Sequence, residues 1–315
     1  MKAVVTGGAG FVGSHLTRRL LSEGWDVLVL DNLSSGYRTN VPQEARFKWL
    51  DLSNDDAGAQ LPKEKFDVIF HLASRVGQET SFQEPLYDLR SNIFPTMTLL
   101  KWAMDQKIQQ VIFASSVNVY GTPIKFPITE DTAIDLPSPY AVGKYSSEAL
   151  CRIYANFGVN FTCLRLFNIY GPGQDMENLL QGMASIYMTY VARKEPILVR
   201  GSLDRFRDFV FVTDAVDAFY RCANERAYGK TYNVCTGKKT YVQDLLNLII
   251  KEFGYDPQTY PIIQGEPTRR DQFGFYGEPT LINTDLGWEP KININQGIKE
   301  MVHDFRNRID SGRLF

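Results

Sequence analysis

Hydrophobic residues in the first half of the chain form short unbroken runs, which are separated by longer segments with a helical period. The runs are rich in Val, Ile, Leu and Phe, and they lie at residues 2–6, 26–30, 67–72, 111–114 and 160–166. Unbroken apolar runs of this length are typical of strands buried on both faces of a sheet. Helical patterns lie between them at residues 14–23, 85–106 and 140–157. This alternation predicts an α/β protein with a doubly wound parallel sheet of the Rossmann type.

The second half of the chain, which begins after Gly171-Pro172-Gly173, has a different pattern of predicted secondary structure. Short strands such as 209–212 and 231–234 separate helical patterns, which lie at residues 178–193, 214–224, 242–252 and 294–307. We interpret residues 1–172 as a Rossmann domain, to which elements near residues 209–236 return. Residues 173–315 are then a smaller C-terminal α/β substrate lobe, with a cleft between the two parts.

The composition narrows the class of protein. Of 315 residues, 44% are hydrophobic and 22% are charged, which excludes a disordered, collagen-like or coiled-coil chain. The 34 Lys and Arg residues nearly balance 36 Asp and Glu residues, so we expect neither nucleic acid nor an anionic membrane as a partner. No apolar run reaches the roughly 18 residues of a membrane span, and the first residues are typical of a strand rather than a signal peptide. We therefore expect a cytoplasmic protein.

Neither the cysteines nor the histidines have the spacing of a metal site. The four cysteines are scattered without a Cys-x-x-Cys motif, and we expect buried thiols in a reducing compartment. The three histidines, His15, His71 and His303, lie far apart in the sequence. We therefore expect a protein that requires no metal.

A glycine-rich turn follows the first strand and opens the first helix. Gly7, Gly10 and Gly13 have the spacing G-x-x-G-x-x-G, which allows backbone amides at a helix N-terminus to approach a pyrophosphate. Asp31 follows the second strand, where a carboxylate can accept a hydrogen bond from the adenosine ribose and repel a 2′-phosphate. The pattern predicts NAD rather than NADP. Glycine-rich turns without ligand occur as well, and Asp31 could instead cap a turn.

Tyr140 and Lys144 start the helix that follows Pro137-Ser138-Pro139, and they share one helix face. A nearby ammonium and a cationic nicotinamide ring stabilise a phenolate, so we expect a lowered pKa for Tyr140 and a role as general base. Ser115 and Ser116 end a predicted strand, at the edge where α/β sheets bind ligands. Taken alone, the Tyr–Lys pair also fits a solvated helix face.

Six motifs occur in an order that resembles the extended short-chain dehydrogenase/reductases, and among these the nucleotide-sugar epimerase group. They are the glycine turn, His71-Leu72-Ala73, Ser115-Ser116-Val117-Asn118-Val119-Tyr120-Gly121, Tyr140-x-x-x-Lys144, Phe167-Asn168-x-Tyr170-Gly171-Pro172 and Arg207-Asp208-Phe209-Val210. The resemblance extends from residue 1 to about Trp288. It implies an NAD-dependent enzyme that acts on a nucleotide-diphosphate sugar, with a UDP-sugar favoured.

The resemblance also implies roles for individual residues. The NAD site is expected to comprise Gly7, Gly10, Phe11, Val12, Gly13, Asp31, Asn32, Asp51, Leu52, Leu72, Ala73, Asn92, Ser115, Tyr140 and Lys144. The catalytic residues are expected to be Ser116, Tyr140 and Lys144. Pro95 departs from the family pattern, which has a glycine just after the equivalent of Asn92.

The substrate residues implied by the resemblance are Ser116, Asn168, Arg207, Arg269, Arg270 and Phe275. Two guanidinium groups suit bidentate recognition of a diphosphate. Without the resemblance, Arg207 beside Asp208 would be interpreted as an ordinary ion pair. Phe275 corresponds to a bulky ring in relatives that accept only unacetylated hexoses, so we expect poor tolerance of a 2-acetamido sugar. Alternatively, Phe275 is a core aromatic residue.

The residues after Ser116 discriminate among the reactions of the family. Sugar 4,6-dehydratases and UDP-glucuronate decarboxylases carry a carboxylate there, whereas this chain has Val117 and Asn118. We therefore expect 4-epimerisation of a UDP-hexose, such as UDP-glucose to UDP-galactose, through a 4-keto intermediate. Epimerisation of UDP-glucuronate or another nucleotide sugar and reduction of a 4-keto sugar remain alternatives. A non-enzymatic NAD-sensing module is a further one.

Helices 85–106 and 140–157 contain more apolar residues than helices that only flank a sheet. These residues are Leu86, Leu89, Met97, Leu100, Leu150, Ile153 and Tyr154. Relatives pair these two helices across a two-fold axis in a four-helix bundle, so we expect a homodimer. Packing between helix and sheet explains part of the same pattern.

Overall fold

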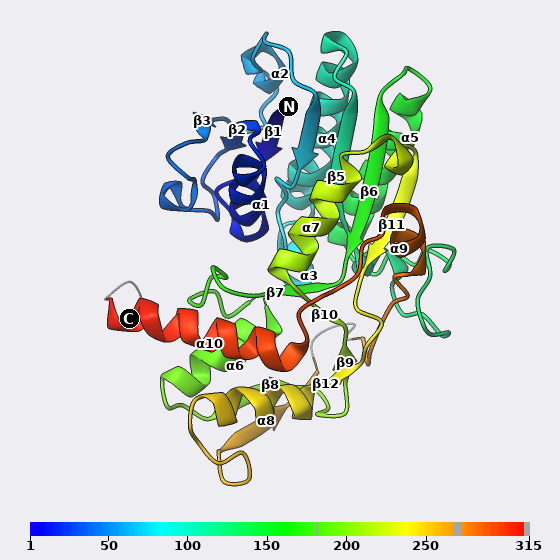
Figure 1. Ribbon diagram of the computed structural model, residues 1–315. Coiled ribbons are helices and arrows are strands. Elements are labelled where there is room, and N and C mark those ends of the chain that lie inside the picture. The colour runs from blue at the N-terminus through cyan, green and yellow to red at the C-terminus, as the bar shows by residue number, and fades with distance from the viewer. Residues whose placement is uncertain (181, 268–271, 312–315) are drawn as a thin grey trace.

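The computed structural model describes residues 1–180, 182–267 and 272–311, and it contains a seven-stranded parallel sheet with a smaller lobe beneath it (Figure 1). The strand order across the sheet is β11-β6-β5-β4-β1-β2-β3. The strands are β1 (Lys2–Thr6), β2 (Asp26–Asp31), β3 (Arg46–Trp49), β4 (Val68–His71), β5 (Gln110–Ser116), β6 (Asn160–Leu166) and β11 (Lys230–Val234).

The strand order reverses beside β1. The chain runs from β1 to β2 and β3 on one side, and then crosses to β4, β5 and β6 on the other. Loops that leave the carboxyl ends of β1 and β4 therefore diverge, and this is where open α/β sheets bind ligands.

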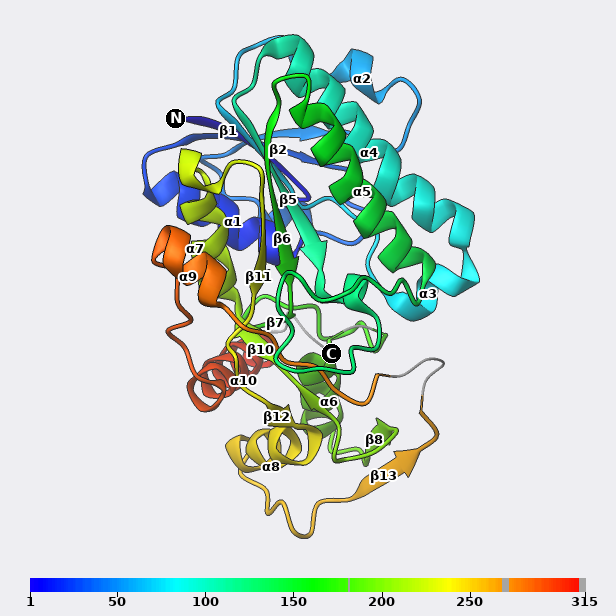
Figure 2. The same cartoon turned by 90° about the vertical axis from the view of Figure 1, so that its right-hand side faces the viewer.

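Helices cover both faces of the sheet. They are α1 (Phe11–Ser22), α2 (Ala57–Gln60), α3 (Gln78–Gln83), α4 (Pro85–Gln106), α5 (Pro139–Ala155), α7 (Val212–Cys222) and α9 (Thr280–Leu286). Helices α1 and α7 lie together on one face (Figure 1), and α4 and α5 lie side by side on the other (Figure 2).

Successive strand residues face opposite helical layers. Val5 packs in the core beneath α1 and α7, whereas its neighbour Val4 packs in the core beneath α4 and α5. The sheet is thus buried on both faces, which explains its unbroken apolar runs.

The smaller lobe has a core of its own. Its helices are α6 (Met183–Ala192), α8 (Val242–Glu252) and α10 (Ile294–Asp310). Three two-stranded sheets accompany them: β7 (Asn168–Tyr170) with β10 (Phe209–Phe211), β9 (Phe206–Arg207) with β12 (Thr240–Tyr241), and β8 (Ile197–Arg200) with β13 (Ile262–Gly265). Short 3₁₀ turns occur at η1 (Arg38–Asn40), η2 (Val117–Tyr120) and η3 (Glu225–Ala227).

The predicted fold class is confirmed, and the five strands predicted in the first half all occur within two residues of their expected ends. The edge strand β3 was not predicted, because its sequence Arg-Phe-Lys-Trp lacks an apolar run. The helix expected at residues 178–193 begins only at Met183. The division at residue 172 stays a prediction, although α7, β11 and α9 lie beyond it and pack on the large sheet.

The expected dimer helices have a mixed outer surface. Leu86, Met97 and Ile153 are exposed, as the dimer prediction requires. Leu100 is instead fully buried against the sheet, so its apolar character reflects helix–sheet packing rather than an outer face. Leu150 and Tyr154 pack partly against the same core.

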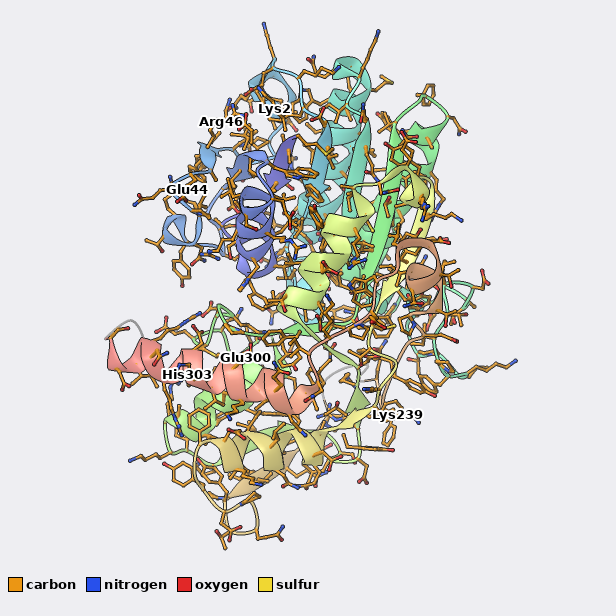
Figure 3. The ribbon with its side chains drawn as sticks, in the orientation of Figure 1. Lys2, Glu44, Arg46, Lys239, Glu300 and His303 are labelled. Carbon is orange, nitrogen blue, oxygen red and sulfur yellow. The ribbon has the colours of Figure 1, made fainter. Side chains whose placement is uncertain are left out.

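The two edges of the sheet differ in chemistry. Exposed ion pairs gather at the amino ends of the strands, where Lys2 and Arg46 share Asp26 and Glu64 (Figure 3). The carboxyl ends face the smaller lobe, which carries Lys239 in the same view (Figure 3). Among the described residues, no helix is long and apolar enough to span a membrane.

Candidate active site

The glycine turn after β1 lies tightly against its neighbours. Gly7 has a positive φ of 73°, and a Cβ added there would lie 2.7 Å from the Ala73 amide nitrogen. A Cβ at Gly13 would lie 2.1 Å from the Gly7 carbonyl oxygen. Both positions therefore require glycine, since any side chain would separate the turn from α1 or from the loop after β4.

The N-terminus of α1 suits an anionic group. Gly10 is the N-cap and has no side chain that could accept from the amides of the first turn, which belong to Phe11, Val12 and Gly13. Exposed amide donors and the positive end of the helix dipole favour a phosphate. The described residues at this turn therefore fit the pyrophosphate of a dinucleotide.

Acidic side chains follow the adjacent strands β2 and β3. The nearly buried carboxylate of Asp31 accepts hydrogen bonds from the amides of Ala9 (2.9 Å) and Leu33 (2.8 Å), which fix its position beside the glycine turn. Asp51 accepts from the Ser53 amide (2.9 Å) and hydroxyl (2.6 Å). Burial raises the pKa of Asp51, but bonds from Ser53 and Asn32 outweigh it and lower that pKa. Both carboxylates are thus held in place by donors from their own loops.

Three predicted catalytic side chains meet at the carboxyl end of β5. Ser138 caps α5 by accepting from the Ala141 amide (3.2 Å), which fixes the helix start beside the strand end. Tyr140 forms a hydrogen bond with the Ser116 side chain, and Lys144 Nζ lies 5.7 Å from the centre of the Tyr140 ring. Lys144 donates to the Ala114 carbonyl (2.8 Å), so it too is anchored to β5.

Burial shifts the ionisation of this pair. It raises the pKa of Tyr140 to about 12, although the bond with Ser116 opposes the change. It lowers the pKa of Lys144 to about 7, although the charge of Asp88 opposes that change. The expected fall in the Tyr140 pKa is therefore not produced by the protein's own groups, because loss of hydration, together with the Asp88 charge, outweighs the bond with Ser116.

A buried chain of hydroxyls supports the loop after β4. His71 bonds through Nδ1 to Thr6 Oγ1 (2.8 Å) and through Nε2 to Thr96 Oγ1 (3.1 Å). The Ala73 amide donates to the same Thr6 hydroxyl (3.1 Å). In the sequence His71 is only part of a motif. In the structure its hydrogen bonds connect β4 with β1 and α4.

Asn92 lies on α4 in contact with this loop. Its amide oxygen accepts from Ser74 Oγ (2.6 Å), and its Nδ2 donates to Asp88 Oδ2 (3.1 Å). Leu72 and Ala73, which precede Ser74, are partly buried beside the cores. Sequence reasoning missed Asp88, although its i, i−4 relation to Asn92 was a usable signal.

A buried ion pair supports Ser115, the neighbour of Ser116. Glu148 accepts from Arg165 through both oxygens, at 2.9 Å from Nε and 2.8 Å from Nη2. The Ser115 hydroxyl also donates to Glu148 (2.6 Å). Sequence reasoning did not find this pair. Glu148 continues the i, i+4 series of Tyr140 and Lys144, which was the available signal.

The expected diphosphate residues lie at the base of the smaller lobe. Asn168 starts β7, and its backbone N–H donates to the backbone carbonyl of Asp208 (3.1 Å). Arg207 is nearly buried, and it donates to the carbonyls of Gln272 (2.9 Å) and Phe273 (3.3 Å). Arg269 and Arg270 lie outside the described residues. The roles of all four toward a diphosphate stay predictions.

Phe275 is packed inside the protein. Its ring is 4% exposed, lies 5.9 Å from the Phe167 ring and is covered by the Arg207 guanidinium at 4.8 Å. This packing favours the core alternative over a ring that forms the sugar wall.

Asp208, the ion-pair partner of Arg207 in the alternative interpretation, has other partners. Its carboxylate accepts from the Thr236 hydroxyl (2.6 Å) and amide (2.8 Å) and from the amides of Gly237 (3.0 Å) and Gly277 (3.3 Å). The ordinary ion-pair interpretation is therefore wrong on the side of Asp208, because backbone and hydroxyl donors occupy the carboxylate. Asp208 holds together the segments that surround Arg207.

Comparison with known proteins identifies the family to which this chain is similar. The profile of the NAD dependent epimerase/dehydratase family matches residues 3–235. A UDP-glucose 4-epimerase of Mycolicibacterium smegmatis is 33% identical over 98% of this chain and 99% of its own length. The crystal structure of UDP-glucose 4-epimerase from Thermotoga maritima with UDP-glucose is similar at a TM-score of 0.93 and 32% identity, over 98% of this chain and 100% of that one.

The similarity is not confined to epimerases. UDP-glucuronic acid decarboxylase 4 of Arabidopsis thaliana is 30% identical over 98% of this chain and 69% of its own length. The family match nevertheless spans the glycine turn, the strands of the large sheet and the Tyr140–Lys144 helix. The chain therefore belongs to the NAD-dependent epimerase/dehydratase family.

Proposed function

We propose that the protein is an NAD-dependent 4-epimerase of UDP-hexoses, which interconverts UDP-glucose and UDP-galactose through a 4-keto intermediate. The observation that carries the proposal is the arrangement of Ser116, Tyr140 and Lys144 at the end of β5. Similarity to UDP-glucose 4-epimerases over nearly the whole chain supports this choice of sugar.

The residues present suit NAD. The amides of the α1 N-terminus would hold the pyrophosphate, and Asp31 would accept from the adenosine ribose. Lys144 has two further N–H donors beyond the one on Ala114, and these suit the other ribose. When bound, NAD supplies the hydride acceptor and donor that oxidation and reduction at C4 require.

Acid–base chemistry falls to Tyr140. As a phenolate it takes the proton of the C4 hydroxyl, with the Ser116 hydroxyl bridging, and it returns the proton when the sugar is reduced again. Because burial and the Asp88 charge raise its pKa to about 12 despite the bond with Ser116, the phenolate requires the positive charges of Lys144 and of the oxidised nicotinamide. The ketone must turn over between the two steps, so that its other face receives the hydride.

The residues after Ser116 support epimerisation over elimination. Loss of water across C5 and C6 needs an acid and a base beside the sugar, which the resembling dehydratases supply just after the catalytic hydroxyl. Here the buried Val117 and the half-buried Asn118 start η2, and neither can donate or accept a proton in this way. Epimerisation needs only the proton relay already described.

The test is incubation of the purified protein with UDP-glucose, UDP-galactose, their N-acetyl forms and UDP-glucuronate, with and without added NAD, followed by chromatography. We expect UDP-glucose and UDP-galactose to reach one equilibrium mixture from either side, without net NADH formation. Conversion of UDP-glucuronate alone would replace the hexose assignment. Stoichiometric consumption of NADH with a 4-keto sugar would identify a reductase instead.

A further inference from the structure

The carboxylate of Asp88 is buried without full compensation. Its side chain on α4 is 0% exposed. Oδ2 accepts from Asn92 Nδ2 at 3.1 Å, but Oδ1 has no hydrogen-bond partner among the described residues. Removing a carboxylate from water in this way is unfavourable unless cations lie nearby. Packing alone therefore does not explain why a carboxylate is buried at this position.

The packing of α4 against α5 puts Asp88 beside the catalytic pair. Both helices return between parallel strands, so they run in the same direction (Figure 2). Gly143 lets them approach closely, because a Cβ there would lie 3.0 Å from Asn92 Cβ. Ser147 Oγ donates to the Asn92 carbonyl (3.1 Å), which fixes the register. Asp88 lies one turn before Asn92 on α4, and Lys144 lies one turn before Ser147 on α5.

Charged and titratable groups from several elements surround Lys144. Asp88 faces it from α4, Tyr140 from its own helix and His71 from β4. Burial lowers the pKa of His71 to about 3, so this ring is neutral near pH 7. From the loop after β4, Arg75 faces Asp88 and pairs with the more exposed Glu84. Burial raises the pKa of Asp88, and the hydrogen bond from Asn92 and the charges of Arg75 and Lys144 oppose that rise. Asp88 is the negative charge that acts on Lys144 among the described residues, and the same charge also raises the pKa of Tyr140.

We propose that Asp88 is a positioning residue for the reaction, whose buried carboxylate holds Lys144 in its cationic form while Tyr140 exchanges its proton. The inference rests on the proposed function in so far as Tyr140 is the general base. Burial without Asp88 would leave Lys144 largely neutral near pH 7, since its pKa is already lowered to about 7 with the carboxylate present. A neutral amine would no longer stabilise the phenolate.

The test measures Lys144 directly, by NMR titration of protein labelled at the lysine ε-carbons, with Lys144→Arg to assign the signal. In Asp88→Asn we expect the Lys144 midpoint to fall by about one pH unit or more. Asp105→Asn is the matched control, because Asp105 lies exposed on the same helix and pairs with Lys101. Its Lys144 midpoint should equal that of the wild type. An unchanged midpoint in Asp88→Asn would overturn the inference.

Kinetics provide a second measurement. In Asp88→Asn the alkaline limb of the kcat profile should move to lower pH by the same amount, with KM for the sugar unchanged, and Asp88→Glu should restore most of it. If Asp88→Asn does not fold, Asp88→Ser tests the same loss of charge with less to bury. A shifted Lys144 midpoint in a protein that converts none of the sugars would refute the proposed function and leave the effect of Asp88 established. Epimerisation with an unshifted midpoint would refute only the inference.

Discussion

Single residues in this site differ from free amino acids chiefly through burial. The Tyr140 phenol and the Lys144 amine lose hydration on burial, which favours their neutral forms. The pKa of Tyr140 is therefore raised to about 12, and that of Lys144 is lowered to about 7. The hydrogen bond with Ser116 opposes the shift of the phenol, and the Asp88 charge opposes the shift of the amine but adds to that of the phenol. The ionisation of Tyr140 and Lys144 therefore depends on contacts with other segments of the chain.

Removing the phenol hydroxyl tests its role as general base. We expect Tyr140→Phe to lower kcat by about 10²-fold or more, because no other group then takes the C4 proton. NAD affinity should stay as in the wild type, since the ring and the Lys144–Ala114 bond are retained. Turnover assays and NAD titration measure the two effects. Tyr154→Phe, on the same helix, is the control, and wild-type turnover by Tyr140→Phe would contradict the assignment.

His71 makes stability depend on pH. Burial and the Lys144 charge lower its pKa from 6.5 to about 3 in the folded protein. Between these values the unfolded chain binds a proton that the folded protein excludes, so stability is lost as the pH falls, by up to about 1.4 kcal/mol per pH unit.

The measurement is urea unfolding of the wild type and His71→Asn between pH 6 and 4. We expect the difference in unfolding free energy between them to shrink as the pH falls, because only the wild type has this slope. His303→Asn is the control, since His303 is exposed on α10 (Figure 3). A difference that stays constant for His71→Asn would show that this ring does not cause the slope.

The arrangement of the loops around the site depends on close contacts at a few residues. The turn between β1 and α1 contacts the loop after β4 only because Gly7 and Gly13 lack side chains. The segment around Phe275 is held by hydrogen bonds from Arg207 to the carbonyls of Gln272 and Phe273. In both cases a small change at one residue moves a whole segment of the site.

Adding one methyl group to the glycine turn should weaken cofactor binding. In Gly13→Ala the new Cβ would lie 2.1 Å from the Gly7 carbonyl oxygen, so the turn must shift away from α1. We expect NAD affinity to fall about tenfold or more, which corresponds to about 1.4 kcal/mol. Calorimetric titration measures it. Gly58→Ala is the control, because its Cβ would meet Thr98 at an ordinary 3.8 Å. Equal affinities in both variants would contradict the expected turn.

Replacing Phe275 separates its two possible roles. As a core ring under Arg207, it should contribute about 3 kcal/mol, so Phe275→Ser should lower the unfolding free energy by that amount and raise KM for the nucleotide sugar. We expect no gain in turnover of UDP-N-acetylgalactosamine relative to UDP-galactose. A gain for the acetylated sugar, with stability unchanged, would instead identify the ring as the wall that excludes the acetamide.

At the scale of the whole molecule, several apolar side chains on α4 and α5 are exposed to solvent. Leu86, Met97 and Ile153 are 83%, 42% and 51% exposed. We propose that these helices form the interface of a homodimer, which would bury them in a bundle of four helices.

Sedimentation at micromolar concentration should show a dimer for the wild type and a monomer for Met97→Asp combined with Ile153→Asp, because buried unpaired carboxylates oppose association. Ile263→Asp serves as the control, since Ile263 is exposed on β13 of the other lobe. A monomeric wild type would refute the proposal.

Features that depend on neighbours along the chain could be predicted from the amino-acid sequence. The period of the hydrophobic residues predicted the strands and helices, and the glycine spacing predicted the turn after the first strand. Because Tyr140 and Lys144 are about one helical turn apart, they were predicted to share one helix face. These are local properties, since a few adjacent residues specify them.

Only the tertiary structure decided which distant groups meet. Asp88 lies far from Lys144 in the sequence, and Glu148 of helix α5 pairs with Arg165 of strand β6. The strand β11 joins the sheet beside β6, about 70 residues earlier in the chain. The packing of Phe275 on Phe167 and Arg207, which favours a core ring, likewise joins segments far apart in the sequence. Pairings of this kind depend on how whole elements pack, and burial then sets the charge of each group, so no local pattern contains them.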